Sequence, residues 1–317
     1  MRRTLAVHFA PSALFVAYIW MLIRAGAFSG RVRWHHALPG TLASAAATLL
    51  AISACAALLG LLLHPFQVRA VRVLEGYWDR WAPTSRLAGV LVEYQRRKWV
   101  AMRDVGTRPL PSDSSTAQKP LREQIRDHEK EQHQLRIRGL AMRRLAALPP
   151  QDVLLPTALG NALRAGELSA GERYGLTTLT SWPRILPQVS APLGAALSSA
   201  RDSLDSSVNL CHSFLASVAL SAVALYDEPG QWWLVLLLLA LAALAYKGAV
   251  TAAQAYAGLM YVVYDLHRFD LVEALRHPMP ERGDEWGAFQ RITDLLARRP
   301  ARSGPYEADG SADAQEM

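Results

Sequence analysis

Two adjacent apolar segments near the C-terminal end constrain the fold of this 317-residue chain more than any other feature. Residues 206–226 contain no Asp, Glu, Lys or Arg, and residues 232–246 are mostly Leu and Ala, with a five-residue turn between them. About 20 apolar residues are needed to cross the hydrocarbon core of a bilayer, and only helices and closed barrels satisfy their backbone groups there. The two segments therefore predict a transmembrane helical hairpin in an all-α integral membrane protein.

Two further apolar segments lie near the N-terminus. Residues 38–63 carry no formal charge and are rich in small side chains, which let helices approach closely in lipid. Residues 4–23 fit three interpretations: a transmembrane helix, a signal peptide with a small-residue cleavage site, or an interfacial or re-entrant helix. Counting this segment as a span gives about four transmembrane helices, with a helical cytoplasmic region inserted between the second and the third.

Composition changes along the chain divide it into five regions. A densely charged middle region separates the apolar ends, a stretch rich in Pro, Ser and Thr interrupts it, and the last residues are rich in Gly, Ser, Asp and Glu. The predicted divisions are a two-span membrane hairpin at 1–64, a cytoplasmic helical region at 65–201 with a linker at 107–120, a membrane hairpin at 202–264 whose helices extend into the cytoplasm, cytoplasmic C-terminal helices at 265–300, and a disordered tail at 301–317.

The distribution of basic residues predicts the orientation. The turn at 227–231 has no Lys or Arg, whereas the middle region is dense in Arg, and cytoplasmic loops carry the excess of basic residues. We expect the middle region and C-terminus to lie in the cytoplasm, although Arg24, Arg31 and Arg33 fall in the first outer loop. The net charge of +7 does not indicate nucleic-acid binding, because no groove-reading motif accompanies it.

The sequence offers no standard catalytic or cofactor signature. It lacks a zincin pair, a Walker loop, a dinucleotide glycine fingerprint and a nucleophile elbow. Cys55 and Cys211 lie inside predicted spans and are interpreted as small packing residues, so neither a disulfide framework nor a metal site is expected. Asp265, His267, Arg268 and Asp270 are interpreted as a salt-bridged helix end. No catalytic residue, metal or cofactor is therefore predicted, which favours a non-enzymatic role.

One polar constellation stands out on the third predicted span. Asp202, Asp205, Asn209 and His212 are spaced by three, four and three residues, so they share one face of a helix. Ionisable residues inside a membrane are candidate functional residues. The stripe has two interpretations: hydrogen bonding between packed helices, or a polar path for protons, ions or a small solute. Asp205 and Lys247 lie at similar depth, so they either form an ion pair or mark the interface, with Lys247 snorkelling.

Several motifs in the second half of the chain carry a resemblance. Leu-Pro-Thr-Ala-Leu-Gly-Asn occupies 155–161, Arg-Tyr-Gly-Leu occupies 173–176, Trp-Pro-Arg-Ile occupies 182–185, and Tyr-Asp-Leu-His-Arg-Phe-Asp occupies 264–270. With these motifs the chain resembles an uncharacterised group of bacterial, mainly actinobacterial, multi-pass membrane proteins. The resemblance implies a multi-pass protein of the bacterial plasma (inner) membrane with this topology, but no activity, because the group has none assigned.

Two functional hypotheses follow from these patterns, with a membrane enzyme third. The first is a non-enzymatic scaffold whose cytoplasmic helices bind a protein partner or assemble the chain into a homo-oligomer, with the lipid bilayer as its other partner. The second is a channel, transporter or membrane-permeabilising effector that uses the polar stripe. A membrane enzyme has the least support, since no nucleophile–base or metal pattern is present.

Overall fold

The computed structural model describes residues 2–28, 30–78, 82–108, 121–281 and 283–297, and every regular element in these ranges is a helix. Most of the predicted linker at 107–120 and all of the predicted tail at 301–317 lie outside these residues. The α-helices are α1 (Arg2–Arg24), α2 (Leu42–Leu63), α3 (Gln67–Glu75), α4 (Ala82–Thr107), α5 (Leu121–Ala146), α6 (Ala158–Ser169), α7 (Thr178–Ile185), α8 (Ala191–Ala224), α9 (Trp232–Ala274) and α10 (Glu285–Ala297).

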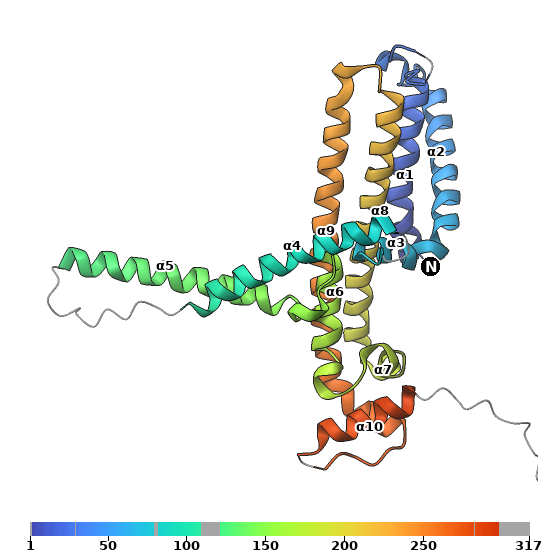
Figure 1. The fold of residues 1–317 in the computed structure, drawn as a ribbon. Helices are drawn as coiled ribbons and strands as arrows, with labels where there is room; N and C mark the ends of the chain where they lie inside the picture. The colour runs from blue at the N-terminus through green and yellow to red at the C-terminus, as the bar shows by residue number, and fades with distance from the viewer. Residues whose placement is uncertain (1, 29, 79–81, 109–120, 282, 298–317) are drawn as a thin grey trace, which may run out of the picture.

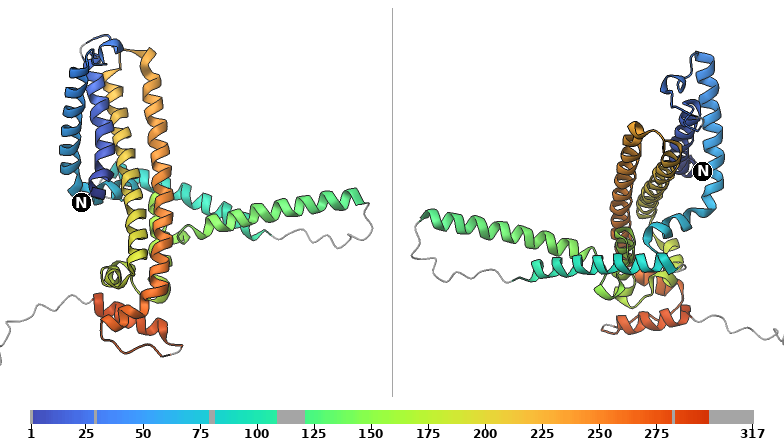
Figure 2. Two further views of the ribbon diagram at one scale, coloured as in Figure 1. Left: turned by 180° about the vertical axis from the view of Figure 1, so that it is seen from behind. Right: turned by 45° about the horizontal axis from the view of Figure 1, so that its top comes forward.

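Four helices, α1, α2, α8 and α9, run side by side as a bundle (Figures 1 and 2). Three segments are long and apolar enough to cross a membrane: Leu42–Glu75, Ala191–Ala224 and Pro229–Ala274. The apolar part of α1, Phe9–Arg24, is shorter. The all-helical, membrane-compatible prediction is therefore confirmed for three helices, and α1 is a packed member of the same bundle.

The two loops that close the bundle meet at one end. The backbone N–H of Val32, after α1, donates a hydrogen bond to Glu228 Oε1 at 2.6 Å. Trp34 Nε1 donates to Gln231 Oε1 at 3.2 Å. Below these contacts, Tyr18 of α1 shares a hydrogen bond with Ser221 of α8, so a buried polar group is satisfied between helices. The α1–α2 loop and the α8–α9 loop thus belong to the same side of the bundle.

Local sequence explains where α2 begins and ends. Thr41 and Ser44 form a reciprocal capping box, which satisfies backbone donors at the helix start. The following residues are apolar up to Leu63, where a short 3₁₀ turn containing Pro65 redirects the chain into α3. The chain therefore turns away from the bundle axis directly below α2.

Helices α8 and α9 continue without a break beyond the bundle, as the sequence predicts. At 1.5 Å per residue, the 43 residues of α9 span about 65 Å, roughly twice the thickness of a bilayer core. The helix continues beyond the predicted boundary at 264 and ends at Ala274. Its additional turns are stabilised because Leu271 and Val272 are fully buried against neighbouring helices. The lower part of α9 therefore lies at the centre of a second helical unit, which it forms with α7 and α10. We call this unit the base.

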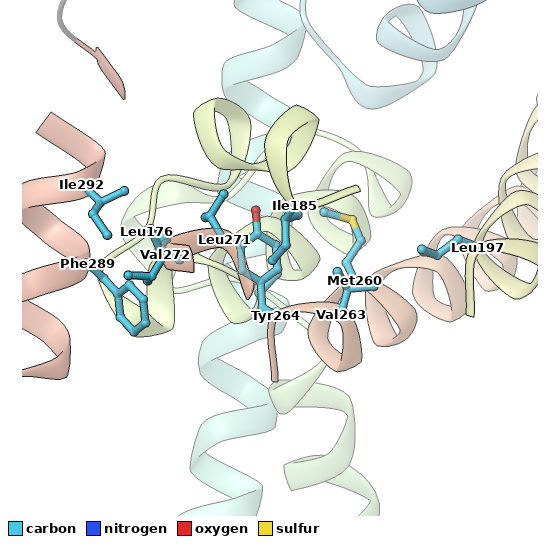
Figure 3. Close-up of a cluster of buried hydrophobic side chains, with 11 residues drawn as sticks. Leu176, Ile185, Leu197, Met260, Val263, Tyr264, Leu271, Val272, Phe289 and Ile292 are labelled. Atoms are coloured by element: carbon cyan, nitrogen blue, oxygen red, sulfur yellow. The ribbon is translucent and has the colours of Figure 1, made fainter. Parts of the chain in front are cut away.

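The base is built around Tyr264 (Figure 3). Its core combines α9 with α7, α10, the first turns of α8 and the turn before α7. The core residues labelled in Figure 3 are Leu176, Ile185, Leu197, Met260, Val263, Tyr264, Leu271, Val272, Phe289 and Ile292. Trp182 stacks on the Tyr264 ring, with 6.1 Å between the ring centroids.

Helix α6 joins the base to the end of α3. Thr157 caps α6 by accepting from the Gly160 N–H, and its hydroxyl donates to the Glu75 carbonyl at 2.8 Å. A Cβ at Gly160 would overlap that same carbonyl, so only glycine permits this approach. Asn161, with no exposed surface, bonds both backbone groups of Leu155. The motif at 155–161 is therefore a structural joint.

Helices α4 and α5 form an antiparallel hairpin, called the arm here, that projects sideways from the bundle beside α3 (Figures 1 and 2). Each helix has 26 residues, which corresponds to about 39 Å. The two helices approach closely where a Cβ at Gly106 would overlap the Met142 sulfur. Arg138 Nε donates to the Gly106 carbonyl at 2.7 Å, which satisfies an acceptor in the last turn of α4.

Candidate functional site

The structure divides the predicted polar stripe of α8 into two parts. Asp202 and Asp205 lie toward the base, where Arg201 Nε is 3.9 Å from Asp205 Oδ2. The Asp205 side chain is 18% exposed, whereas Lys247 is exposed. Among the described residues, Asp205 thus forms an ion pair with Arg201. The predicted pair between Asp205 and Lys247 stays a prediction.

The deeper members of the stripe, Asn209 and His212, line a cavity of about 310 Å³ between α1, α2, α3 and α8. We call it the bundle cavity. Asp202 and Asp205 are not among its lining residues. The lining residues are Pro11, Ser12, Phe15, Leu59, Gly60, Leu63, Phe66, Gln67, Ala70, Asn209, His212, Ser213 and Ala216. Its walls are mainly apolar. Because only two of the four stripe residues reach it, the stripe does not line one common polar surface.

Five of the described residues that line the bundle cavity are polar, and two of them, His212 and Gln67, indicate the chemistry that it can offer. His212 Nδ1 lies 2.9 Å from the Val208 carbonyl oxygen. Because a carbonyl oxygen only accepts hydrogen bonds, Nδ1 must carry the proton, which leaves Nε2 as an acceptor in the neutral ring. Gln67 Nε2 is buried and has no hydrogen-bond partner. The sequence does not predict that Gln67 lies near His212. Gln67 is the first residue of α3, and only the folded structure brings it next to α8.

A second polar cluster lies at the surface of the base. Arg173 pairs with Asp265, and Tyr174 donates to the same carboxylate. The Arg173 guanidinium also lies 4.0 Å from the Tyr261 ring centroid, a cation–π contact. Burial raises the pKa of Tyr174, as does its hydrogen bond to Asp265. Each charge in this cluster has a partner, which indicates a structural role.

The predicted salt-bridged end at 265–270 is confirmed, although it lies within α9 and not at the end of the helix. His267 Nδ1 is 2.7 Å from Asp270 Oδ2, and Arg268 Nη2 is 4.0 Å from Glu285 Oε2 on α10. The His267–Asp270 pair lies within α9, whereas Asp265 and Arg268 join α9 to other elements, through Arg173 and through Glu285 of α10. All four motifs of the resemblance contribute to the base or to its joint with α3, so their sequence patterns reflect packing.

The arm exposes apolar side chains that contacts within the protein do not cover. Its helices pack mainly on each other, yet many large apolar side chains along them are exposed. Monomeric soluble proteins rarely expose extended apolar patches, so such a surface indicates an interaction site. The exposed apolar residues of the arm are Leu87, Val90, Tyr94, Val105, Ile125, Leu135, Ile137, Leu140 and Met142.

A groove between the two helices concentrates this apolar surface. Its volume is about 410 Å³, and α4 and α5 contribute equally to its walls. Its lining residues are Lys98, Ala101, Met102, Val105, Ile137, Leu140, Ala141 and Arg144. We call it the arm groove. Apolar residues form its floor, with basic side chains from both helices beside them.

The arm also carries most of the net charge of the chain. Helix α4 has five basic and two acidic residues, and α5 has seven basic and four acidic residues. The resulting net charge of +6 compares with +7 for the whole chain. The sequence reveals this charge but not the groove, because apolar positions on two helices combine only once the hairpin forms.

The described residues contain no group of three or more His, Cys, Asp or Glu side chains arranged to hold a metal ion. Comparison of the chain with protein-family models, curated proteins and solved structures finds no match. The resemblance to a bacterial membrane-protein group stays a prediction, and function must be argued from the arm and the bundle cavity.

Proposed function

We propose that this protein is a non-enzymatic membrane scaffold whose arm binds an acidic, amphipathic helix of a cytoplasmic protein. The observation that carries the proposal is the arm groove: an apolar slot, flanked by basic side chains, on a hairpin that packs mainly on itself. Grooves of this kind bind the apolar face of a partner helix.

Charge and placement support a cytoplasmic arm. Only three of the 34 Lys and Arg residues, Arg24, Arg31 and Arg33, belong to the end of the bundle that carries the two closing loops. The positive-inside rule therefore favours the opposite end, with the arm and the base, as cytoplasmic. In this arrangement α1 is the fourth transmembrane helix, because it packs between α2 and α8 over its apolar length. The resemblance to bacterial multi-pass membrane proteins favours a bacterial plasma membrane.

Net charge also discriminates between occupants of the groove. Two copies of the arm would bring together two surfaces of +6, and like charges at an interface oppose association. An acidic helix would instead place carboxylates near Lys98 and Arg144 at the groove. The charge therefore favours a different, acidic partner over a second copy of this chain.

Site-specific photo-crosslinking in cells tests the proposal. A photoreactive residue at position 140 of the full-length protein should form a crosslink to one acidic segment of another protein, identified by mass spectrometry. The same residue at position 125, which is exposed on α5 outside the groove, is the matched control. Lys98→Glu combined with Arg144→Glu should lower the yield at position 140 by about tenfold or more, since charge reversal opposes an acidic helix.

Two outcomes would overturn the proposal. A crosslink from position 140 only to a second copy of the chain would assign the groove to oligomerisation. A yield at position 140 no greater than at position 125 would show that the groove is not an interaction site. Passage of ions or solutes along the α8 stripe has less support, because Asp202 and Asp205 lie outside the cavity that Asn209 and His212 line.

A further inference from the structure

We propose that the bundle cavity binds an uncharged amphiphile that presents a carbonyl oxygen to Gln67 and an apolar body to the cavity walls. This inference is independent of the arm, because the cavity is lined by α1, α2, α3 and α8 and by no described residue of α4 or α5. It rests on three observations: an unpartnered buried donor, a mainly apolar wall within the bundle, and the absence of charged side chains among the described lining residues.

The unpartnered donor calls for an acceptor. Gln67 Nε2 has no hydrogen-bond partner, and a buried donor left in this state costs about 1–3 kcal/mol. Gln67 lines the cavity, and rotation of its side chain toward the cavity would let a carbonyl oxygen on a bound molecule accept from Nε2 and remove that cost. His212 adds an acceptor at Nε2 when its ring is neutral, since Nδ1 is engaged by Val208. A head group with one carbonyl and one hydroxyl would match both side chains.

The cavity walls define the rest of the ligand. Phe15, Leu59, Leu63 and Ala216 supply apolar surface from three helices of the bundle. The volume of about 310 Å³ lies within the range of small-molecule sites. It is large enough for a head group, while a longer apolar tail would continue along the bundle surface into lipid. The ligand is therefore expected to enter from the membrane.

The same walls disfavour a charged head group. No Asp, Glu, Lys or Arg is among the described residues that line the cavity. An ionised carboxylate or phosphate without a counter-charge is costly to bury in a low-dielectric site. Two classes of neutral membrane molecule carry the required carbonyl: diacylglycerols, whose ester carbonyl and hydroxyl match both Gln67 and His212, and isoprenoid quinones, whose ring carbonyls match Gln67 alone. Free fatty acids, which carry a carboxylate, are excluded on this argument.

Ligand-dependent thermal stabilisation of the full-length protein in detergent distinguishes these sources. The probes are a short-chain diacylglycerol, a short-chain benzoquinone and a fatty acid of similar length, each titrated separately. One of the first two should raise the melting temperature in a saturable manner, because a ligand that binds only the folded state stabilises it. The fatty acid should bind at least about tenfold more weakly.

Variants separate binding from folding. Gln67→Leu should weaken the apparent affinity about tenfold, the value expected for one hydrogen bond of about 1.4 kcal/mol. Gln254→Leu, on the exposed face of α9 outside this cavity, should leave the affinity unchanged. Ala216→Phe, which fills the cavity without removing a polar group, should abolish the shift.

Any of four results would overturn the inference. These are the absence of saturable stabilisation by both neutral probes, tighter binding of the fatty acid, unchanged affinity in Gln67→Leu, and unchanged affinity in Ala216→Phe. A melting temperature measured without ligand accompanies each variant, so a variant that fails to fold is recognised. In that case, Gln67→Met, which keeps roughly the length of the side chain but has no hydrogen-bond donor, takes the place of Gln67→Leu and should also bind more weakly.

Discussion

Asn161 offers the sharpest test of how the joint between α3, α6 and the base is stabilised. Its side chain has no exposed surface and bonds the Leu155 backbone twice. The Leu155 N–H donates to Asn161 Oδ1 at 2.7 Å, and Asn161 Nδ2 donates to the Leu155 carbonyl at 3.0 Å. Asn161→Ala removes both partners at once. Leu155 is then left with a donor and an acceptor that no longer have partners in the turn before α6.

The expected loss follows from these two bonds. Each backbone group left without a partner costs about 1–3 kcal/mol, and partial exposure of Leu155 places the total near 2–4 kcal/mol. At about 2–4 °C per kcal/mol for a unit of 150–250 residues, the melting temperature should fall by about 4–16 °C. Circular dichroism of the detergent-solubilised protein measures this shift, and hydrogen exchange at the Leu155 amide reports the local opening.

A second substitution separates lost hydrogen bonds from lost volume. Asn161→Leu restores the volume that alanine removes but not the polar partners of Leu155, so it should be about as unstable as Asn161→Ala. Ser198→Ala is the control, because the Ser198 hydroxyl bonds only the Gly194 carbonyl of its own helix and is exposed. Wild-type stability in Asn161→Leu would refute the reasoning, since the cost would then come from the empty volume.

Two further predictions concern a turn in the base and the contact between the closing loops. Gly175→Ala should destabilise the base by about 1–2 kcal/mol, because φ is +86° and the added Cβ would lie 2.8 Å from an α10 carbonyl; chemical denaturation measures it. The control Gly194→Ala, with open space at the Cβ position in α8, should be neutral or stabilising. Glu228→Ala removes the acceptor of the Val32 N–H and should speed tryptic cleavage at the loop arginines, whereas cleavage in the exposed neighbour variant Asp227→Ala should match wild type. Equal cleavage rates in the two acidic variants would show that the loops are not held by this bond.

The proposals for the arm and the bundle cavity make independent predictions. Charge reversal at Lys98 and Arg144 should affect crosslinking from position 140 but not ligand-dependent melting. Gln67→Leu should affect ligand-dependent melting but not crosslinking, because the two sites share no lining residue. Each proposal can therefore fail without the other.

Several features of the fold follow directly from local sequence. The apolar segments at 206–226 and 232–246 predict helices α8 and α9, and the absence of proline from the interior of both predicts that they continue past the bundle. Length and apolar composition determine whether a helix can cross a membrane, and both are properties of a single segment. The sequence does not predict that α9 continues from 264 to Ala274, because Leu271 and Val272 are buried in a core that includes α10, a later part of the chain.

The candidate sites depend on contacts between segments that the sequence does not pair. Spacing by three and four placed Asp202, Asp205, Asn209 and His212 on one helical face, which is correct for an isolated helix. That face meets different neighbours along its length, so Asn209 and His212 reach the bundle cavity while Asp205 pairs with Arg201. Periodicity identifies residues that share a face, but it carries no information about what the face contacts.

The sequence alone therefore determined the class of this protein: a helical membrane chain with a basic region between its apolar ends. Only the tertiary structure decided that this basic region folds into a sideways arm with an apolar groove, and that Gln67 completes a cavity with residues of α8. The reason is physical. Hydrophobicity and charge act along the chain and can be read from it, whereas a groove or cavity exists only where separate helices are brought together by packing.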